Sequence, residues 1–286
     1  MTLPNPTAAV GRMAALVVPM FVACGERGRS SDPEPGPRVV SLHDVTTEIV
    51  VALDATDRLR GIAEPVDLAG DVQNAVLAVP RVAGIESIVS VRPDVVLGLG
   101  VVAEQDPELV HRLKHEGIDV QLADPATLDD VAVLIQSVAG RLGTGGAGEQ
   151  LVARLRANTA TKEVSPKPPV RVFVYDCCDP PFTAGGKTVL TDLITRAGGS
   201  NIFSDLDVDW MHVSWEQVIV RRPELVVIHS YGQAQQGDVA DKQNTLRRVS
   251  ALAELPTAVV PLGCSLGGLR SIEGLERLRL AMRERS

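Results

Sequence analysis

The chain has 286 residues, of which 45% are apolar and only 3% aromatic, and its formal net charge at pH 7 is −8. This length permits one large domain or two ordinary ones, and the apolar fraction is high enough for well-filled cores. The acidic balance argues against nucleic acid and against an anionic membrane surface as partners.

The first residues are typical of an exported protein. Arg12 is followed by an apolar run at residues 13–23, which is too short to span a bilayer but suits the core of a signal peptide. Phe-Val-Ala-Cys at residues 21–24 resembles a bacterial lipobox, although Phe stands where that motif usually has Leu. We therefore expect residues 1–23 to be a signal peptide and Cys24 to carry a lipid anchor. Ordinary secretory cleavage beside an incidental cysteine is the alternative.

The segment after the cysteine, residues 24–37, consists of Gly, Ser, Pro and charged residues with almost nothing apolar. Such a composition cannot collapse into a core and predicts a flexible tether. No other segment of the sequence is long and apolar enough to span a membrane. These features predict a protein of the cell envelope, in the periplasm or at the outer face of the cytoplasmic membrane, attached through its lipid anchor alone.

Short apolar strands alternate with helical stretches from residue 38 onward. The predicted strands are 38–41, 59–62, 95–98 and 119–122 in the first half, and 171–175, 225–228 and 257–261 in the second. Near-continuous apolar strands separated by helices are typical of a parallel sheet buried on both faces. The sequence therefore predicts an α/β fold of two Rossmann-like lobes, at residues 38–143 and 169–286.

The two lobes are expected to be joined by one long helix. An amphipathic helix is predicted over residues 128–142, the glycine-rich stretch 143–148 ends it, and a second helix follows over about 149–161. Together with the proline-containing stretch after it, this second helix makes residues 144–168 the connection. A helical connector permits little hinge motion, because bending it would break backbone hydrogen bonds.

One pattern occurs twice in the chain. Residues 85–97 and 214–228 read almost alike: a short helix with one glutamate, an Arg-Pro pair and a buried strand. Because proline lacks the N–H of a helix interior and disfavours helical geometry in the residue before it, both helices should end at their Arg-Pro pairs. The repeat predicts two lobes of similar build, each presenting a glutamate at a corresponding place.

Three motifs of the second half carry a family resemblance. They are Pro-Pro-Phe-Thr-Ala-Gly at residues 180–185, Ala-Gly-Gly-Ser-Asn-Ile-Phe at 197–203 and Val-Asp-Trp-Met-His-Val-Ser-Trp-Glu-Gln-Val at 208–218. In this order they resemble the periplasmic substrate-binding proteins whose lobes are joined by one rigid helix, the receptors for cobalamin, ferric siderophores and haem in ABC importers. The resemblance covers roughly residue 38 to the C-terminus, and it is specific for the family but not for the ligand.

The resemblance implies a lipid-anchored receptor that captures a metal chelate or cofactor-like ligand between its lobes and delivers it to an ABC permease. It implies no cofactor beyond a ligand that can itself contain cobalt or iron, and we expect a monomer. In that family each lobe offers one surface glutamate to arginines of the permease, and by motif position these are Glu86 and Glu216. The alternative is that both merely complement their helix dipoles.

Candidate ligand contacts come from the loops that follow the strands, since ligands of open α/β sheets bind outside the carboxyl ends of the strands. Trp210 is the first candidate, because a cobalamin receptor of this family has a tryptophan at the same motif position and a flat ring suits a planar macrocycle. A tryptophan that caps the core of its lobe is the alternative. The full set of predicted ligand contacts is Trp210, Tyr231, Tyr175, His43, Cys178, His229 and Arg270.

Three further cysteines, Cys177, Cys178 and Cys264, fall in predicted cleft loops. Vicinal cysteines rarely pair with each other because the small ring is strained, so we expect free thiols or a bridge from one of the pair to Cys264. The first alternative function is a receptor that binds a transition metal ion directly through these cysteines and nearby histidines. No CxxC or HxxxH spacing supports it, and we predict no metal site.

The sequence shows no catalytic constellation. Gly-Gly-Lys-Thr at residues 185–188 ends like a phosphate loop, but Pro181 stands where that loop needs its first glycine. A nucleophile elbow is absent as well. We therefore predict that the protein is not an enzyme, and a secreted enzyme of unknown reaction is the second alternative.

Overall fold

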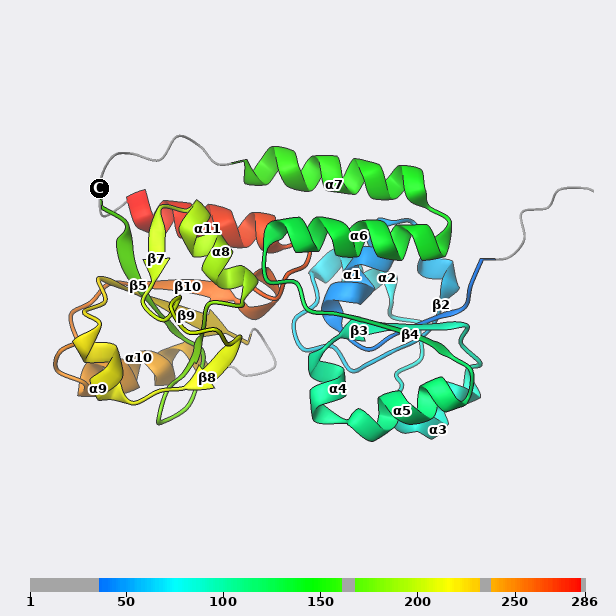
Figure 1. The fold of residues 1–286 in the computed structure, drawn as a ribbon, viewed down its shortest axis with the longest axis horizontal. Coiled ribbons are helices and arrows are strands. Elements are labelled where there is room, and N and C mark those ends of the chain that lie inside the picture. Colours follow the sequence, from blue (N-terminus) through cyan, green and yellow to red (C-terminus); the bar gives the residue numbers. More distant parts are fainter. Residues whose placement is uncertain (1–35, 161–167, 232–237, 284–286) are drawn as a thin grey trace, which may run out of the picture. The chain divides into compact units, whose positions relative to one another are not determined.

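The computed structural model describes residues 36–160, 168–231 and 238–283, and these contain two parallel sheets, each covered by helices (Figure 1). The predicted signal peptide, the lipidation site Cys24 and nearly all of the predicted tether lie outside the described residues. Within the described part of the chain, no helix has both the length and the apolar character needed to cross a membrane. The α/β fold predicted from the sequence is confirmed.

The N-terminal and C-terminal halves of the chain repeat one strand order. The N-terminal half contains β1 (Val39–Ser41), α1 (Asp44–Ala52), β2 (Leu59–Ile62), α2 (Gly70–Ala75), α3 (Gly84–Ser90), β3 (Val95–Leu99), α4 (Val101–Gln105), α5 (Pro107–His115), β4 (Asp119–Ala123) and α6 (Leu128–Leu142). After α7 (Gly145–Thr159), the C-terminal half contains β5 (Val170–Tyr175), β6 (Phe182–Ala184), α8 (Val189–Arg196), β7 (Gly199–Asn201), β8 (Trp210–His212), α9 (Trp215–Val220), β9 (Leu225–Ser230), α10 (Asp238–Arg248), β10 (Thr257–Pro261) and α11 (Ser271–Arg283). The sheets run β2-β1-β3-β4 and β7-β5-β9-β10, so β1 and β5, β3 and β9, and β4 and β10 hold equivalent places.

The central strands are buried on both faces, which explains their near-continuous apolar sequence. Alternate residues of a strand face opposite sides of its sheet. In β1, Val39 joins the core formed with α1 and α6, and Val40 joins the core formed with α3 and α5. In β5, Val172 joins the core formed with α8 and α11, and Phe173 joins the core formed with α9 and α10.

Helix α6 is shared by the two halves. It packs against α1 of the N-terminal half and against α8 of the C-terminal half, and one hydrophobic cluster contains residues of both sheets. The backbone N–H of Leu128, the first residue of α6, donates to Oδ2 of Asp192 in α8 at 2.9 Å. Helix α7 packs on α6 and reaches α11 (Figure 1). The helical connection is therefore packed along its length against the rest of the protein.

The glycine-rich stretch between α6 and α7 differs from its prediction. The break is confined to Gly143 and Thr144, because α7 already begins at Gly145, within the stretch that the sequence assigns to the breaker. Gly143 alone supplies the turn, with a left-handed φ of 65°. Gly148 has a different role, since a Cβ there would collide with the side chain of Ala139 on α6. This glycine allows the two helices to pack closely.

Three strands are missing from the sequence prediction: β6, β7 and β8. Each has three residues, which is too short for a period to be visible in the sequence. Strands β6 and β8 pair antiparallel, with Phe182 opposite His212 and Ala184 opposite Trp210. This two-stranded antiparallel sheet positions Trp210.

The duplicated unit of the sequence is also duplicated in three dimensions. Helix α3 ends at Ser90 and α9 at Val220, and the arginine before each proline is left-handed, with φ of 49° at Arg92 and 50° at Arg222. Both helices thus end two residues before the arginine-proline bond, as the proline rule predicts.

The repeat extends to a charged pair at the start of each central strand. The backbone N–H of Arg38 donates to Asp94 at 2.7 Å, and the guanidinium lies 2.8 Å from the same carboxylate. In the other half, the backbone N–H of Arg171 donates to Glu224 at 2.9 Å, and the guanidinium lies 3.3 Å from it. The residue after each proline therefore ties its loop to the neighbouring strand in both halves.

Candidate functional site

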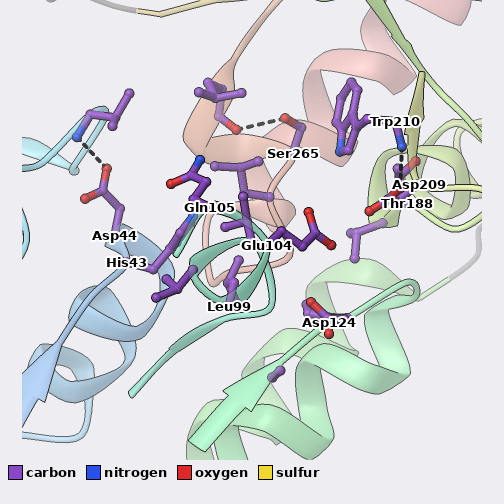
Figure 2. A pocket seen from close by; sticks show the side chains of 18 of the residues that line it. His43, Asp44, Leu99, Glu104, Gln105, Asp124, Thr188, Asp209, Trp210 and Ser265 are labelled. Carbon is purple, nitrogen blue, oxygen red and sulfur yellow. Dashed lines mark hydrogen bonds between the residues drawn. The ribbon is translucent and has the colours of Figure 1, made fainter. Parts of the chain in front are cut away.

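A cavity of about 740 Å³ lies at the carboxyl ends of the strands of both sheets (Figure 2). Parallel strands end at one edge of their sheet, so the loops that follow them gather there. The walls come from the loops after β1, β2, β3 and β4, and from the loops after β5, β9 and β10 together with the two-stranded β6–β8 sheet and the residues beside it. The volume is within the usual range of small-molecule sites.

Three of the seven predicted ligand contacts line this cavity: His43, Trp210 and Tyr231. The other four, Tyr175, Cys178, His229 and Arg270, are placed outside its lining. The two groups have different surroundings.

His43 stands at the N-terminus of α1, where its Nδ1 accepts a hydrogen bond from the backbone N–H of Val45 at 3.2 Å. The hydroxyls of Thr46 and Thr47 both donate to the carbonyl oxygen of His43, which fixes the backbone at this point. Burial lowers the pKa of His43 and outweighs the opposing charge of Asp44. The imidazole is therefore neutral at pH 7.

Trp210 forms part of the opposite wall. Its indole stacks on Phe182, with ring centroids 5.9 Å apart and an interplanar angle of 19°, and it is tilted against His229 at 5.5 Å. The ring is partly exposed and lines the cavity (Figure 2). It is thus supported on one side by the protein while it remains accessible to a ligand.

Tyr231 belongs to a buried polar network at the end of β9. Its hydroxyl donates to Oδ2 of Asp176 at 2.7 Å, and Nδ1 of His229 lies 2.7 Å from Oδ1 of the same carboxylate. Burial opposes the ionisation of Asp176, but the hydrogen bonds from His229 and Tyr231 outweigh it and lower the pKa of this carboxyl group. Burial and the Asp176 carboxylate together raise the pKa of Tyr231. The ammonium of Lys242 lies 4.4 Å from the Tyr231 ring centroid.

His229 and Tyr175 are core residues. His229 is fully buried, and its carbonyl oxygen accepts from Lys242 at 2.6 Å. Tyr175 is 2% exposed and packs between Phe173 and Trp215, and its hydroxyl donates to the carbonyl of Cys178 at 2.9 Å. These side chains support the wall from behind.

The cysteines pair differently from the prediction. Cys177 and Cys178 form a vicinal disulfide, which the sequence analysis considered rare, and Cys264 is a free thiol. Cys264 is fully buried in the core with α11, and burial raises the pKa of its thiol to about 12. It is therefore inaccessible to the pair, which lies in a tight turn where Cys178 has φ of 75°.

Arg270 links the two halves instead of facing the cavity. Its Nη1 donates to the carbonyl oxygen of Asp67 at 2.6 Å and lies 3.3 Å from the Asp67 carboxylate and 3.8 Å from Oε1 of Glu48. The same Asp67 carboxylate accepts from the backbone N–H of Gly263 at 2.8 Å. Residues of the C-terminal loop after β10 are thus bonded to the N-terminal half, and Arg270 is committed to this contact.

Glu48 gives this contact a pH dependence. Burial raises the pKa of Glu48 from 4.5 to about 7, against the opposing effects of the Ala69 N–H and of Arg270, and Asp44 and Asp67 raise it further. The folded state favours the protonated carboxyl group of Glu48. Its contribution to the free energy of unfolding is therefore fully present below pH 4.5 and is lost as the pH rises through 7.

Glu48→Gln should therefore remove a component of the pH dependence of stability. Between pH 4.5 and pH 8, the wild type is expected to lose on the order of 1 to 3 kcal/mol relative to the variant. Urea denaturation across this range measures the difference. Parallel curves for the two proteins would contradict the assignment.

Glu86 and Glu216 occupy matching positions outside the cavity, in the first turns of α3 and α9. Both are exposed, and Glu86 has a weak ion pair with Arg112 at 3.4 Å. A hydrogen bond with Ser214 lowers the pKa of Glu216, so this side chain is ionised at neutral pH. The structure thus presents two carboxylates at equivalent places, as the repeat predicts.

Sequence reasoning missed several charged residues of the wall, namely Glu64, Glu104, Asp124 and Lys187. Asp124 follows β4 directly and could have been found from its position at a strand end. Glu104 lies on the short helix α4, whose five residues show no helical period of their own in the sequence.

The sequence matches the periplasmic binding protein family over residues 39–258. The chain belongs to this family. Among its relatives is the vitamin B12-binding protein of Yersinia pestis (strain Pestoides F), which is 28% identical over 228 residues, or 79% of this chain and 76% of the relative. The family and this relative are binding proteins, and the resemblance found in the three sequence motifs is confirmed.

Solved structures of periplasmic binding proteins share the fold. One from Veillonella parvula has a TM-score of 0.77 at 24% identity and covers 86% of this chain and 91% of its own. The periplasmic heme-binding protein of Roseiflexus sp. RS-1 has a TM-score of 0.69 at 24% identity, covering 86% and 98%. The Fe3+-hydroxamate transport protein of Saccharomonospora viridis has a TM-score of 0.71 at 22% identity, covering 86% and 93%.

Proposed function

We propose that this chain is the substrate-binding component of an ABC importer and captures a metal chelate or cofactor-like ligand of the cobalamin, haem or ferric siderophore type. The observation that carries the proposal is the cavity, which is built from both halves of a periplasmic binding protein and contains the accessible ring of Trp210. The names of its relatives support the ligand class, since they include a vitamin B12-binding protein and a heme-binding protein.

Trp210→Ala is expected to weaken ligand binding by about tenfold or more, since ring stacking contributes on the order of 1 kcal/mol beyond the burial of the indole. Calorimetric titration of the purified protein with cyanocobalamin, haemin and a ferric hydroxamate measures the affinities. Tyr231→Phe should have a smaller effect, because the Tyr231 hydroxyl is already bonded to Asp176.

Trp215→Phe is the matched control, because Trp215 packs on Phe173 and Tyr175 outside the cavity. The chain has only two tryptophans, so this control leaves Trp210 as its single tryptophan fluorophore, and ligand should still quench its emission. Unchanged ligand affinity in Trp210→Ala would contradict a role of this ring in binding and would favour the alternative, in which Trp210 caps the core of its lobe. Failure of all three ligands to bind the wild type would contradict the proposed function.

The proposal includes the attachment and the partner of the protein. Cys24 carries a lipid anchor in the cell envelope after removal of residues 1–23, as the lipobox-like sequence supports. The protein acts as a monomer and docks on the permease through Glu86 and Glu216, which the exposure and equivalent placement of these residues support.

Direct binding of a transition metal ion through cysteine and histidine is less favoured. Cys177 and Cys178 are bonded to each other, Cys264 is buried, and His229 is bonded to Asp176. Within the described ranges, no three His, Cys, Asp or Glu side chains are placed together as metal ligands. The side chains that this alternative needs are thus engaged in other contacts.

A further inference from the structure

The walls of the cavity are strongly acidic. Among the described lining residues, six carry carboxylates and one, Lys187, carries a permanent positive charge. The carboxylates come from both halves: Asp44, Glu64, Glu104, Asp124, Asp176 and Asp209. Figure 2 shows Glu104 and Asp124 from one half and Asp209 from the other on the same cavity.

The carboxylates of Asp124 and Asp209 are held in place by the backbone. Oδ1 of Asp124 accepts from the N–H of Gly100 at 2.9 Å, and Oδ1 of Asp209 accepts from the N–H of Trp210 at 2.8 Å. Gly100 is required for this arrangement, because a Cβ there would collide with the Asp124 carboxylate. In each case the second carboxylate oxygen is left to accept a hydrogen bond from a ligand.

The positive charge on the wall is already compensated. Lys187 lies 3.0 Å from Asp207, a carboxylate that does not itself line the cavity. His43 is neutral at pH 7 because burial lowers its pKa. Two of the six carboxylates also face cations, Glu64 facing Arg81 at 3.8 Å and Asp176 facing Lys242. The negative field of the cavity therefore comes mainly from the other four, Asp44, Glu104, Asp124 and Asp209.

We infer that the cavity selects chelates that are neutral or cationic and carry amide, amine or hydroxyl donors, and that it discriminates against chelates with free carboxylates. This inference rests on the proposed function and narrows its ligand. Hydrogen-bond donors of a ligand can bond to the fixed carboxylate oxygens. An anionic group of a ligand would lose its hydration on entering the cavity and would also be repelled by the carboxylates of the wall. The amide-bearing corrinoids and the cationic hydroxamates meet this condition, and haem, with two propionates, does not.

The test uses ligands that share one chelate and differ in the charge of a terminal group. Ferrioxamine B ends in an ammonium group, its N-acetyl derivative in a neutral amide and its N-succinyl derivative in a carboxylate, while the ferric chelate is the same. Cyanocobalamin and its monocarboxylic acid form a second matched set. In each set the carboxylate compound is expected to bind about tenfold or more weakly at low salt. The difference should shrink in about 0.5 M salt, where charges are screened.

Two isosteric variants test whether the carboxylates of the cavity wall cause the weaker binding of the carboxylate compounds. Glu104→Gln and Asp124→Asn should both raise the affinity for the carboxylate compound relative to its neutral counterpart. Glu108→Gln is the matched control, since Glu108 is exposed and lies outside the cavity lining, and it should leave the ratio unchanged.

The outcomes separate the inference from the proposed function. If a carboxylate compound binds as tightly as its neutral counterpart, or if haemin binds more tightly than every neutral or cationic chelate, the inference is overturned while the proposed function stands. If none of these chelates binds, the proposed function fails, and the inference fails with it.

Discussion

Replacing Glu86 and Glu216 together by alanine is expected to abolish uptake of the ligand through the partner importer while ligand affinity stays unchanged. Both carboxylates are exposed, occupy equivalent first turns of α3 and α9 and lie outside the cavity lining. Truncating one partner of a well-formed interfacial charge pair costs about 2 kcal/mol or more. Either single variant should therefore retain partial uptake, because the other half can still dock.

Uptake into vesicles that contain the importer, with ligand binding measured in parallel, checks this expectation. Glu108→Ala combined with Glu276→Ala is the matched control, since it removes two exposed glutamates from other helices and changes the net charge equally. If the glutamates only complement helix dipoles, the double variant would be slightly less stable and would keep its uptake. Collapse of ligand binding in the double variant would also contradict the docking role.

The fold could be predicted because its determinants are local. The central strands β1, β3 and β9 are buried almost throughout and therefore read as apolar runs. The edge strands β2 and β10 occupy the predicted residues as well. The Arg-Pro pairs mark the ends of α3 and α9, since the effect of proline on its neighbour needs no tertiary context. Strands β6 and β8 escaped prediction because three residues have no period and their pairing joins distant segments.

The site could be predicted only in part, because position along the chain does not give the direction of a side chain. Tyr175 ends β5 and His229 lies in β9, yet both side chains are buried in the protein. Tyr231, one residue beyond β9, reaches the cavity. A shift of one residue in a strand reverses the face, and loop residues follow no such rule.

The cysteines and Arg270 show a second reason why the site could not be fully predicted from the sequence. From the sequence, free thiols and a bridge to Cys264 were both open, and the vicinal pair was considered rare. The core around α11 encloses the Cys264 thiol, which no spacing in the sequence reveals. Arg270 was assigned to the ligand, but its partners Glu48 and Asp67 lie about 200 residues earlier in the chain. Contacts of this range depend on how the two halves pack.

Arg270→Met is expected to lower the free energy of unfolding by about 3 kcal/mol, because it leaves the largely buried Asp67 carboxylate without its cation and removes the hydrogen bond to the Asp67 carbonyl oxygen. The Arg270 side chain is only 16% exposed, and Glu48 and Asp67 are 5% and 15% exposed. The loop around Gly263 and Arg270 would also lose part of its attachment to the N-terminal half. Urea denaturation at pH 7 measures the loss.

Arg277→Met is the matched control for this loss. Its guanidinium pairs with Glu273 one helical turn away, and both side chains are nearly half exposed, so the control should change stability by about 0.5 kcal/mol or less. Adding Glu48→Gln to Arg270→Met should restore part of the stability, because Glu48, without the cation that lowers its pKa, must take up a proton on folding at pH 7 and glutamine need not. Equal losses in the two arginine variants would contradict the linking role. If Arg270→Met instead weakens ligand binding and leaves stability unchanged, Arg270 contacts the ligand, as the sequence alone predicts.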